Sequence, residues 1–197
     1  MINGVHAAAF VEPTAAHPEV AVRKAVMADI PPILELINSY AERGVMLPRT
    51  EFELSEAIRD FSVVMRAGAL LGCGALHFYT PTLGEIRSLA VREDVMTHGV
   101  GRKLVEALVA EAQEYSLDAV FAFTYVRDFF RKVGFLEVER GALPLKAWKD
   151  CLRCPKFQAC DEIAVLRLLR PDRWTQEPAG AWTSGDQYIQ IPTPRIG

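Results

Sequence analysis

A glycine loop between a strand pattern and a helix pattern is the part of this sequence best suited to binding a ligand. Gly99 and Gly101 follow the apolar segment 85–91 and precede a long helical repeat. The first N–H groups of a helix have no partner within it, and the helix dipole adds partial positive charge there. Such a loop favours a phosphate or pyrophosphate. The residues expected to contribute are Met96, Thr97, His98, Gly99, Val100, Gly101, Arg102 and Lys103.

Three cysteines near the C-terminus have a spacing that partly fits a metal site. Cys151, Cys154 and Cys160 form Cys-x2-Cys-x5-Cys, and the first step suits a zinc turn. Tetrahedral zinc needs a fourth ligand, for which Asp161 and Cys73 are candidates, because the second half of the chain contains no histidine. A zinc knuckle, a redox-sensitive thiol group and three unrelated thiols all stay open. We expect no bound metal, and we expect Cys73, in an apolar strand, to be a core residue.

Composition and charge narrow the class of protein. Half of the 197 residues are hydrophobic and 24% are charged, as in an ordinary globular domain with a real core. A net charge of −3 gives no reason to expect a nucleic-acid partner. No apolar run approaches the roughly 18 residues that span a bilayer, and the N-terminus lacks a signal-peptide pattern. We therefore expect a cytoplasmic protein with reduced thiols and no membrane partner.

The elements that must position these residues occupy one central region. Residues 1–18 are expected to be a flexible leader, 19–170 one domain and 171–197 an irregular tail, since prolines and glycines interrupt both ends. Asp29 is the expected N-cap of the first helix, and the Thr50–Glu53 spacing predicts a capping box for the second. Apolar periodicity predicts strands at 20–23, 62–65, 69–79, 83–91, 119–123, 135–139 and 163–169, and helices at 30–41, 51–58, 100–112 and 126–133. This order predicts an α/β fold with a mixed sheet and helices on both faces.

The order of elements, together with three short segments, resembles the GNAT acetyltransferases. The segments are 22–25 at the front, 89–91 before the glycine loop, and Phe-Arg-Lys-Val-Gly-Phe at 130–135. The resemblance covers about residues 20–169. It implies the GNAT acyl-CoA N-acyltransferase fold, in which the fourth and fifth strands diverge.

That resemblance implies acetyl-CoA as the co-substrate, lying in the gap between the diverging strands. Main-chain groups of the fourth strand, at Leu89, Ala90 and Val91, would hold the thioester arm, and the loop at 96–102 would hold the pyrophosphate. Two residues depart from the family pattern. Met96 stands where Arg or Gln is usual, and Phe130 stands where many members have a tyrosine that acts as general acid.

Within this superfamily the sequence is similar to the short bacterial N-acetylglutamate synthases. The segments that carry this similarity are 44–50, 53–54, 58–61, 85–91, 129–130, 143–151, 154–157 and 160–162. The similarity implies direct acetyl transfer, in a ternary complex, to the α-amino group of L-glutamate in arginine biosynthesis. Acetylation of another small amine or a protein N-terminus stays open, as does a non-catalytic acetyl-CoA-binding module. A homodimer is also an open alternative.

The family position of Glu85 implies a general base, because an α-ammonium must lose a proton before it attacks a thioester. The alternative is a solvent-exposed glutamate at a strand end. With Phe130 in the tyrosine position, Thr124 and Tyr125 are the nearest hydroxyls for protonating the leaving thiolate. Ordinary packing of both hydroxyls, with water as the proton donor, is the alternative.

A substrate with two carboxylates is best held by guanidinium groups, which pair with carboxylates in a bidentate manner. By the resemblance, Arg49 lies in the loop that covers the acceptor site, and Arg87 shares a strand face with Glu85. We therefore expect Arg49 and Arg87 to bind the amino-acid substrate. Surface or structural ion pairs are the alternative for both arginines. Lys146 and Trp148 are further candidates for the acceptor side.

Overall fold

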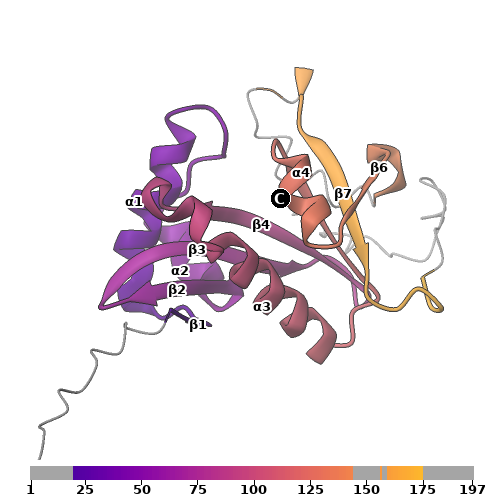
Figure 1. Ribbon diagram of the computed structural model, residues 1–197, viewed down its shortest axis with the longest axis horizontal. Helices are drawn as coiled ribbons and strands as arrows, with labels where there is room; N and C mark the ends of the chain where they lie inside the picture. Colours follow the sequence, from indigo (N-terminus) through magenta and orange to yellow (C-terminus); the bar gives the residue numbers. More distant parts are fainter. Residues whose placement is uncertain (1–19, 144–155, 157–158, 175–197) are drawn as a thin grey trace, which may run out of the picture.

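The computed structural model describes residues 20–143, 156 and 159–174 of the chain. Its core is a seven-stranded sheet with helices on both faces (Figure 1). The strands are β1 (Ala21–Lys24), β2 (Phe61–Arg66), β3 (Ala69–Phe78), β4 (Leu83–Val91), β5 (Ala119–Thr124), β6 (Leu136–Val138) and β7 (Ile163–Leu168). The α-helices are α1 (Ile30–Ala41), α2 (Glu51–Ala57), α3 (Val100–Glu114) and α4 (Arg127–Lys132). Short 3-10 turns η1 (Met27–Asp29), η2 (Ile58–Asp60), η3 (Glu93–His98) and η4 (Arg140–Ala142) connect them.

The strand order confirms the predicted mixed α/β sheet. The strands lie in the order β1-β2-β3-β4-β5-β7-β6, so the last strand of the chain inserts between β5 and β6. All neighbouring pairs are antiparallel except β4 and β5, which are parallel. The leader at 1–18 and most of the tail lie outside the described residues. At the start of the tail, Trp174 packs against a cluster that includes Leu83 and Phe121.

The parallel pair β4–β5 separates after three residue pairs, as expected. Pairing begins at Leu83 with Ala119 and ends at Glu85 with Phe121. Beyond that point β4 continues with β3 as far as Val91, while β5 continues with β7. The two halves of the sheet therefore open into a wedge that starts at Glu85.

A β-bulge in β4 lies inside this wedge. Ala75 of β3 pairs with Arg87, and Cys73 pairs with Ala90, so β4 carries one more residue than β3 over this stretch. Ser88 has a φ of +52°, which is the left-handed region. An extra residue of this kind is left out of the ladder, and the Ser88 carbonyl accepts a weak hydrogen bond from Cys73 Sγ at 3.8 Å.

Each face of the sheet is covered by its own apolar core. On one face, Val105 and Leu108 of α3 pack against Leu76 and Ile86. On the other face, helices α1 and α2 cover β2 and β3. Cys73 is fully buried in this second core, and burial raises the pKa of its thiol to about 12. Its predicted place in the core is confirmed.

Local sequence signals locate the starts of α1 and α2, but only at α2 does the N-cap side chain bond to the helix. At α2 the capping box is present, because the Glu53 N–H donates to Thr50 Oγ1 at 3.2 Å and the Thr50 N–H donates to Glu53 Oε2 at 2.9 Å. Asp29 is the N-cap residue of α1, as predicted, but its side chain makes no cap hydrogen bond to that helix. That carboxylate instead accepts the Val26 N–H at 2.8 Å and pairs with Arg23 at 2.6 Å. The guanidinium outcompetes the helix end because a charged, bidentate pair is the stronger interaction.

Candidate functional site

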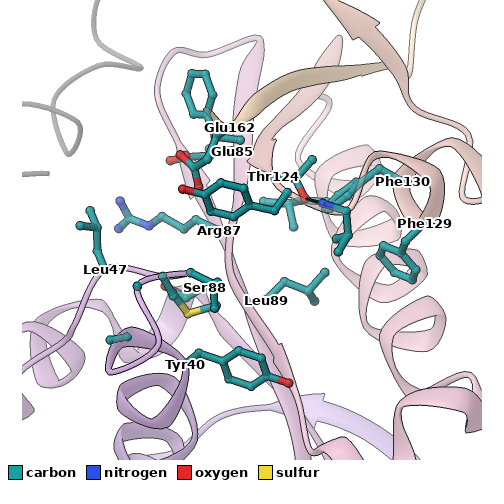
Figure 2. A pocket seen from close by; sticks show the side chains of 18 of the residues that line it. Tyr40, Leu47, Glu85, Arg87, Ser88, Leu89, Thr124, Phe129, Phe130 and Glu162 are labelled. Carbon is teal, nitrogen blue, oxygen red and sulfur yellow. Dashed lines mark hydrogen bonds between the residues drawn. The ribbon is translucent and has the colours of Figure 1, made fainter. Parts of the chain in front are cut away.

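The wedge between β4 and β5 contains a cavity of about 700 Å³ (Figure 2). One wall is β4 and its bulge, another is the loop that follows α1, and the third is formed by the end of β5, α4 and the segment before β7. The charged residues that line it are Arg49, Glu85, Arg87, Arg140, Lys156 and Glu162. The cavity is therefore apolar toward α4 and ionic at the other end, where a polar substrate would fit.

The glycine loop meets the cavity at the start of α3. Gly99, with a φ of +76°, ends η3 and allows α3 to begin at Val100. Gly101 lines the cavity, and a Cβ placed there would lie 3.3 Å from the ring of Phe129. The first-turn N–H groups of α3 lack partners within the helix. This end of the cavity is thus suited to an anionic group that approaches main chain closely.

The side chains of the predicted loop residues lie in several different environments. Met96 lines the cavity and Val100 is buried in the core, while His98 is exposed. Arg102 Nη2 donates to the Lys132 carbonyl at 3.2 Å, and Lys103 Nζ donates to the Val20 carbonyl at 3.4 Å. Nothing is described of the Thr97 side chain. These side-chain roles in phosphate binding stay predictions.

Strand β4 presents its last residues to the cavity in alternation. Leu89 and Val91 line it, whereas Ala90 points into the core with 2% of its surface exposed. The Tyr40 hydroxyl donates to the Val91 carbonyl at 2.5 Å. This hydrogen bond ties α1 to the end of β4.

Glu85 lies at the point where β4 and β5 separate. Only 8% of its surface is exposed, and it lines the cavity. The alternative of a solvent-exposed strand-end glutamate is therefore wrong. Its role as a base stays a prediction. On the neighbouring strand, His77 is its register partner, and His77 Nδ1 contacts Asp60 Oδ2 at 2.9 Å.

Arg49 and Arg87 both line the cavity, from different elements. The main chain of Arg49 is held by Asn38, whose Oδ1 accepts the Arg49 N–H at 2.9 Å and whose Nδ2 donates to the Arg49 carbonyl at 3.0 Å. Arg87 Nη2 lies 3.9 Å from Asp60 Oδ2. The fold thus brings together two guanidinium groups that are 38 positions apart in sequence, since Arg49 and Arg87 share one cavity.

The two candidate hydroxyl groups differ in their environment. Thr124 is buried, and its Oγ1 accepts the Val126 N–H at 3.0 Å. The Tyr125 hydroxyl donates to Asp161 Oδ1 at 2.9 Å and accepts from Lys156 Nζ at 3.2 Å. Burial is the main cause that raises the pKa of Tyr125. Both residues line the cavity, and their role as proton donors stays a prediction.

Three cavity residues were not found by the sequence reasoning as parts of an ionic site: Arg140, Cys160 and Glu162. Arg140 Nη2 donates to Cys160 Sγ at 3.1 Å and to the Glu162 carbonyl oxygen. Burial raises the pKa of the Glu162 carboxyl. An acidic residue immediately before a predicted strand was the available signal for Glu162. The insertion of β7 beside β5, which brings Glu162 to the cavity, has no such local signal.

The zinc alternative is not tested by the described residues. Among them, no group of three or more His, Cys, Asp or Glu residues is placed to hold a metal ion. Cys151 and Cys154 lie outside the described residues, as do Lys146 and Trp148. Asp161, a candidate fourth ligand, is hydrogen-bonded to Tyr125. Within the described ranges, none of the helices has the length and apolar character needed to cross a membrane.

Comparison with known proteins identifies relatives of the whole domain. Residues 31–135 match the model of the acetyltransferase (GNAT) family. An uncharacterized N-acetyltransferase of Chlorobaculum tepidum is 44% identical over 148 residues, which is 75% of this chain and 96% of that protein. An amino-acid acetyltransferase of Mycobacterium tuberculosis is 37% identical over 135 residues, covering 67% of this chain and 77% of that one.

Solved structures agree with this assignment. A Mycobacterium tuberculosis protein crystallised in complex with CoA matches with a TM-score of 0.67 and 30% identity, over 76% of this chain and 99% of that one. N-acetylglutamate synthase from Neisseria gonorrhoeae, complexed with coenzyme A and N-acetyl-glutamate, matches with a TM-score of 0.70 and 29% identity. That match covers 79% of this chain but 36% of the longer enzyme.

Proposed function

Because this chain belongs to the acetyltransferase (GNAT) family, we propose that it acetylates the α-amino group of L-glutamate with acetyl-CoA as donor. The observation that carries the proposal is the cavity itself, which is lined by the buried acid Glu85 and by Arg49 and Arg87. Relatives named amino-acid acetyltransferase support an amino acid as acceptor. The activity would belong to arginine biosynthesis in the cytoplasm.

Acetyl-CoA fits the wedge on steric and electrostatic grounds. Gly101 lines the cavity, and the absence of a side chain there lets the Phe129 ring pack close to the start of α3. The N-terminus of α3 offers unpaired N–H groups to a pyrophosphate, with loop residues 96–103 around it. The bulge at Ser88 would offer its main-chain N–H groups to the thioester arm, with Leu89 and Val91 alongside. A donor held there would carry its acetyl group toward Glu85.

In this proposal, different residues of the cavity act at different steps of the reaction. Glu85 takes a proton from the α-ammonium, whose pKa of about 8 leaves it mostly charged at neutral pH. Main-chain N–H groups near Leu89 and Ala90 stabilise negative charge on the carbonyl oxygen as it is attacked. Phe130 is buried against Phe129 and Phe135 and supplies no hydroxyl. Thr124, Tyr125 or water would return a proton to the departing thiolate.

Arg49 and Arg87 explain the choice of a dicarboxylic acceptor. Planar guanidinium groups pair with carboxylates in a bidentate manner. Arg49 is presented by a loop whose main chain is fixed by Asn38, and Arg87 by the bulged strand β4. A rigid pair of cations on two walls would select a substrate with a carboxylate at a fixed distance from its amine.

The proposal is tested by measuring thiol release from acetyl-CoA with the purified protein and L-glutamate. We expect turnover with L-glutamate that exceeds turnover with L-glutamine, L-aspartate and a short peptide. In the same assay, Arg49→Ala should raise the KM for L-glutamate at least about tenfold, the loss of one charged contact, and leave the KM for acetyl-CoA unchanged. Arg59→Ala, an exposed arginine outside the cavity, is the matched control.

Two outcomes would overturn the proposal. Turnover only with other amines would assign the protein to a different acceptor within the family. Binding of acetyl-CoA by calorimetry without turnover of any amine would make it a non-catalytic binding module. A rise in both KM values for Arg49→Ala would argue against a role of this residue in holding the substrate carboxylate.

A further inference from the structure

Two acidic side chains line the ionic end of the cavity, although they come from distant parts of the chain. Glu85 belongs to β4, and Glu162 immediately precedes β7. Figure 2 shows both at the same end of the pocket, while the Arg87 guanidinium is directed toward Leu47. The Arg87 guanidinium and the two carboxylates thus lie in separate parts of one cavity, which Arg140 and Lys156 also line. This separation matches the charges of an amino acid, which carries an ammonium and a carboxylate on one carbon atom.

Glu162 is held in place by contacts to its main chain and its neighbour. Arg140 Nη2 donates to the Glu162 carbonyl oxygen and, at 3.1 Å, to Cys160 Sγ. Cys160 Sγ in turn donates weakly to Glu162 Oε2, at 3.8 Å. These contacts fix the position of Glu162 through its backbone and leave most of the hydrogen-bonding capacity of the carboxylate for another group.

The charge of Glu162 is only distantly compensated within the protein. In the described ranges, no ion pair within 4 Å involves its carboxylate, and the cations that act on it are Arg140, which binds its main chain, and Lys156. Burial, and to a smaller extent Asp161, raise the pKa of Glu162, while Cys160, Arg140 and Lys156 lower it. A half-buried carboxylate is costly unless a cation or a donor meets it. Because Arg140 and Lys156 form no ion pair with this carboxylate within 4 Å in the described ranges, a cationic ligand in the cavity would supply the closer partner.

We propose that Glu162 binds the α-ammonium of the amino-acid acceptor and thereby makes the site specific for an amine. This inference rests on the proposed function. An ammonium has three N–H donors, so Glu85 can remove one proton while Glu162 accepts another donor and keeps the nitrogen at the Glu85 end. Glu162 is then a substrate-binding residue, and Arg140 is the residue that positions it.

The experiment compares L-glutamate with glutarate, the same dicarboxylic acid without the amino group. For Glu162→Gln, we expect the KM for L-glutamate to rise about 10- to 100-fold, the loss of a charge-assisted contact. Inhibition by glutarate, measured as Ki against L-glutamate, should stay within about twofold of wild type or become tighter, since a repulsive carboxylate is removed. The KM for acetyl-CoA should not change.

Matched variants separate this role from a structural one. Glu114→Gln, at the exposed end of α3, should change none of these constants. Glu162→Asp, which keeps the charge, should recover part of the affinity for L-glutamate. A Glu162→Gln protein that loses glutamate and glutarate to the same extent, or neither, would overturn the inference. Failure of wild type to acetylate L-glutamate would instead overturn the proposed function, and the comparison would be repeated with the accepted amine and its deaminated analogue.

Discussion

At the scale of single residues, the chemistry of this site depends on where carboxylates are buried. Glu85 is 8% exposed and sits where two strands part, so its carboxylate faces the cavity and not the solvent. His77, its register partner on β3, contacts Asp60. This arrangement gives the proposed base a fixed position beside the proposed acceptor.

We expect Glu85→Gln to lower kcat by about 100- to 10,000-fold, the usual contribution of a positioned base. The KM for acetyl-CoA should change little, because the glutamate does not touch the loop that is expected to bind the pyrophosphate. Steady-state kinetics with L-glutamate measures both constants. Glu56→Gln, an exposed residue of α2 outside the cavity, serves as control. Unchanged kcat in Glu85→Gln would remove Glu85 from the mechanism.

At the scale of elements, the sequence patterns located nearly every strand and helix. The tight turn between β2 and β3 is an example. Its residues Ala67 and Gly68 have φ values of +49° and +80°, and a glycine in the sequence is a direct signal for a turn that needs a positive φ. The bulge at Ser88 was not predicted. It depends on how β4 aligns with β3, and a local pattern of apolar residues does not encode that alignment.

The same turn offers a test of stability that is independent of catalysis. Ala67 adopts a left-handed conformation that asparagine tolerates better than alanine. We expect Ala67→Asn to raise the free energy of unfolding by about 0.5–1 kcal/mol, measured by urea denaturation with an unchanged slope. Ala67→Val, with a β-branched side chain, should lower it. The opposite order of the two variants would contradict the assigned turn.

At the scale of the whole molecule, the sheet is two halves joined by a short parallel pair. The halves are held together by three β4–β5 residue pairs and by the packing of α3 and α4 residues in one core. A ligand that fills the wedge contacts both halves at once. Ligand binding should therefore stabilise the molecule as a unit, whereas a homodimer stays an untested prediction.

We expect acetyl-CoA to raise the free energy of unfolding by about 2.7 kcal/mol when present at about 100 times its Kd. In hydrogen exchange, amides at 86–91 and 99–102 should become more protected than those of β1 and β2, which lie far from the wedge. Thermal or urea unfolding with and without the ligand gives the first quantity. No stabilisation at millimolar acetyl-CoA would contradict the proposed cofactor site.

The sequence by itself determined the order of strands and helices, the glycine loop and the candidates Glu85, Arg49 and Arg87. Each of these was predicted from a local sequence pattern (apolar periodicity, turn residues or a short motif) or from the family resemblance. Only the tertiary structure decided that Glu85 is buried, that Ser88 forms a bulge, and that β7 inserts beside β5 to bring Glu162 to the cavity. These features depend on pairing and packing between segments far apart in the chain, and such contacts leave no local pattern to read.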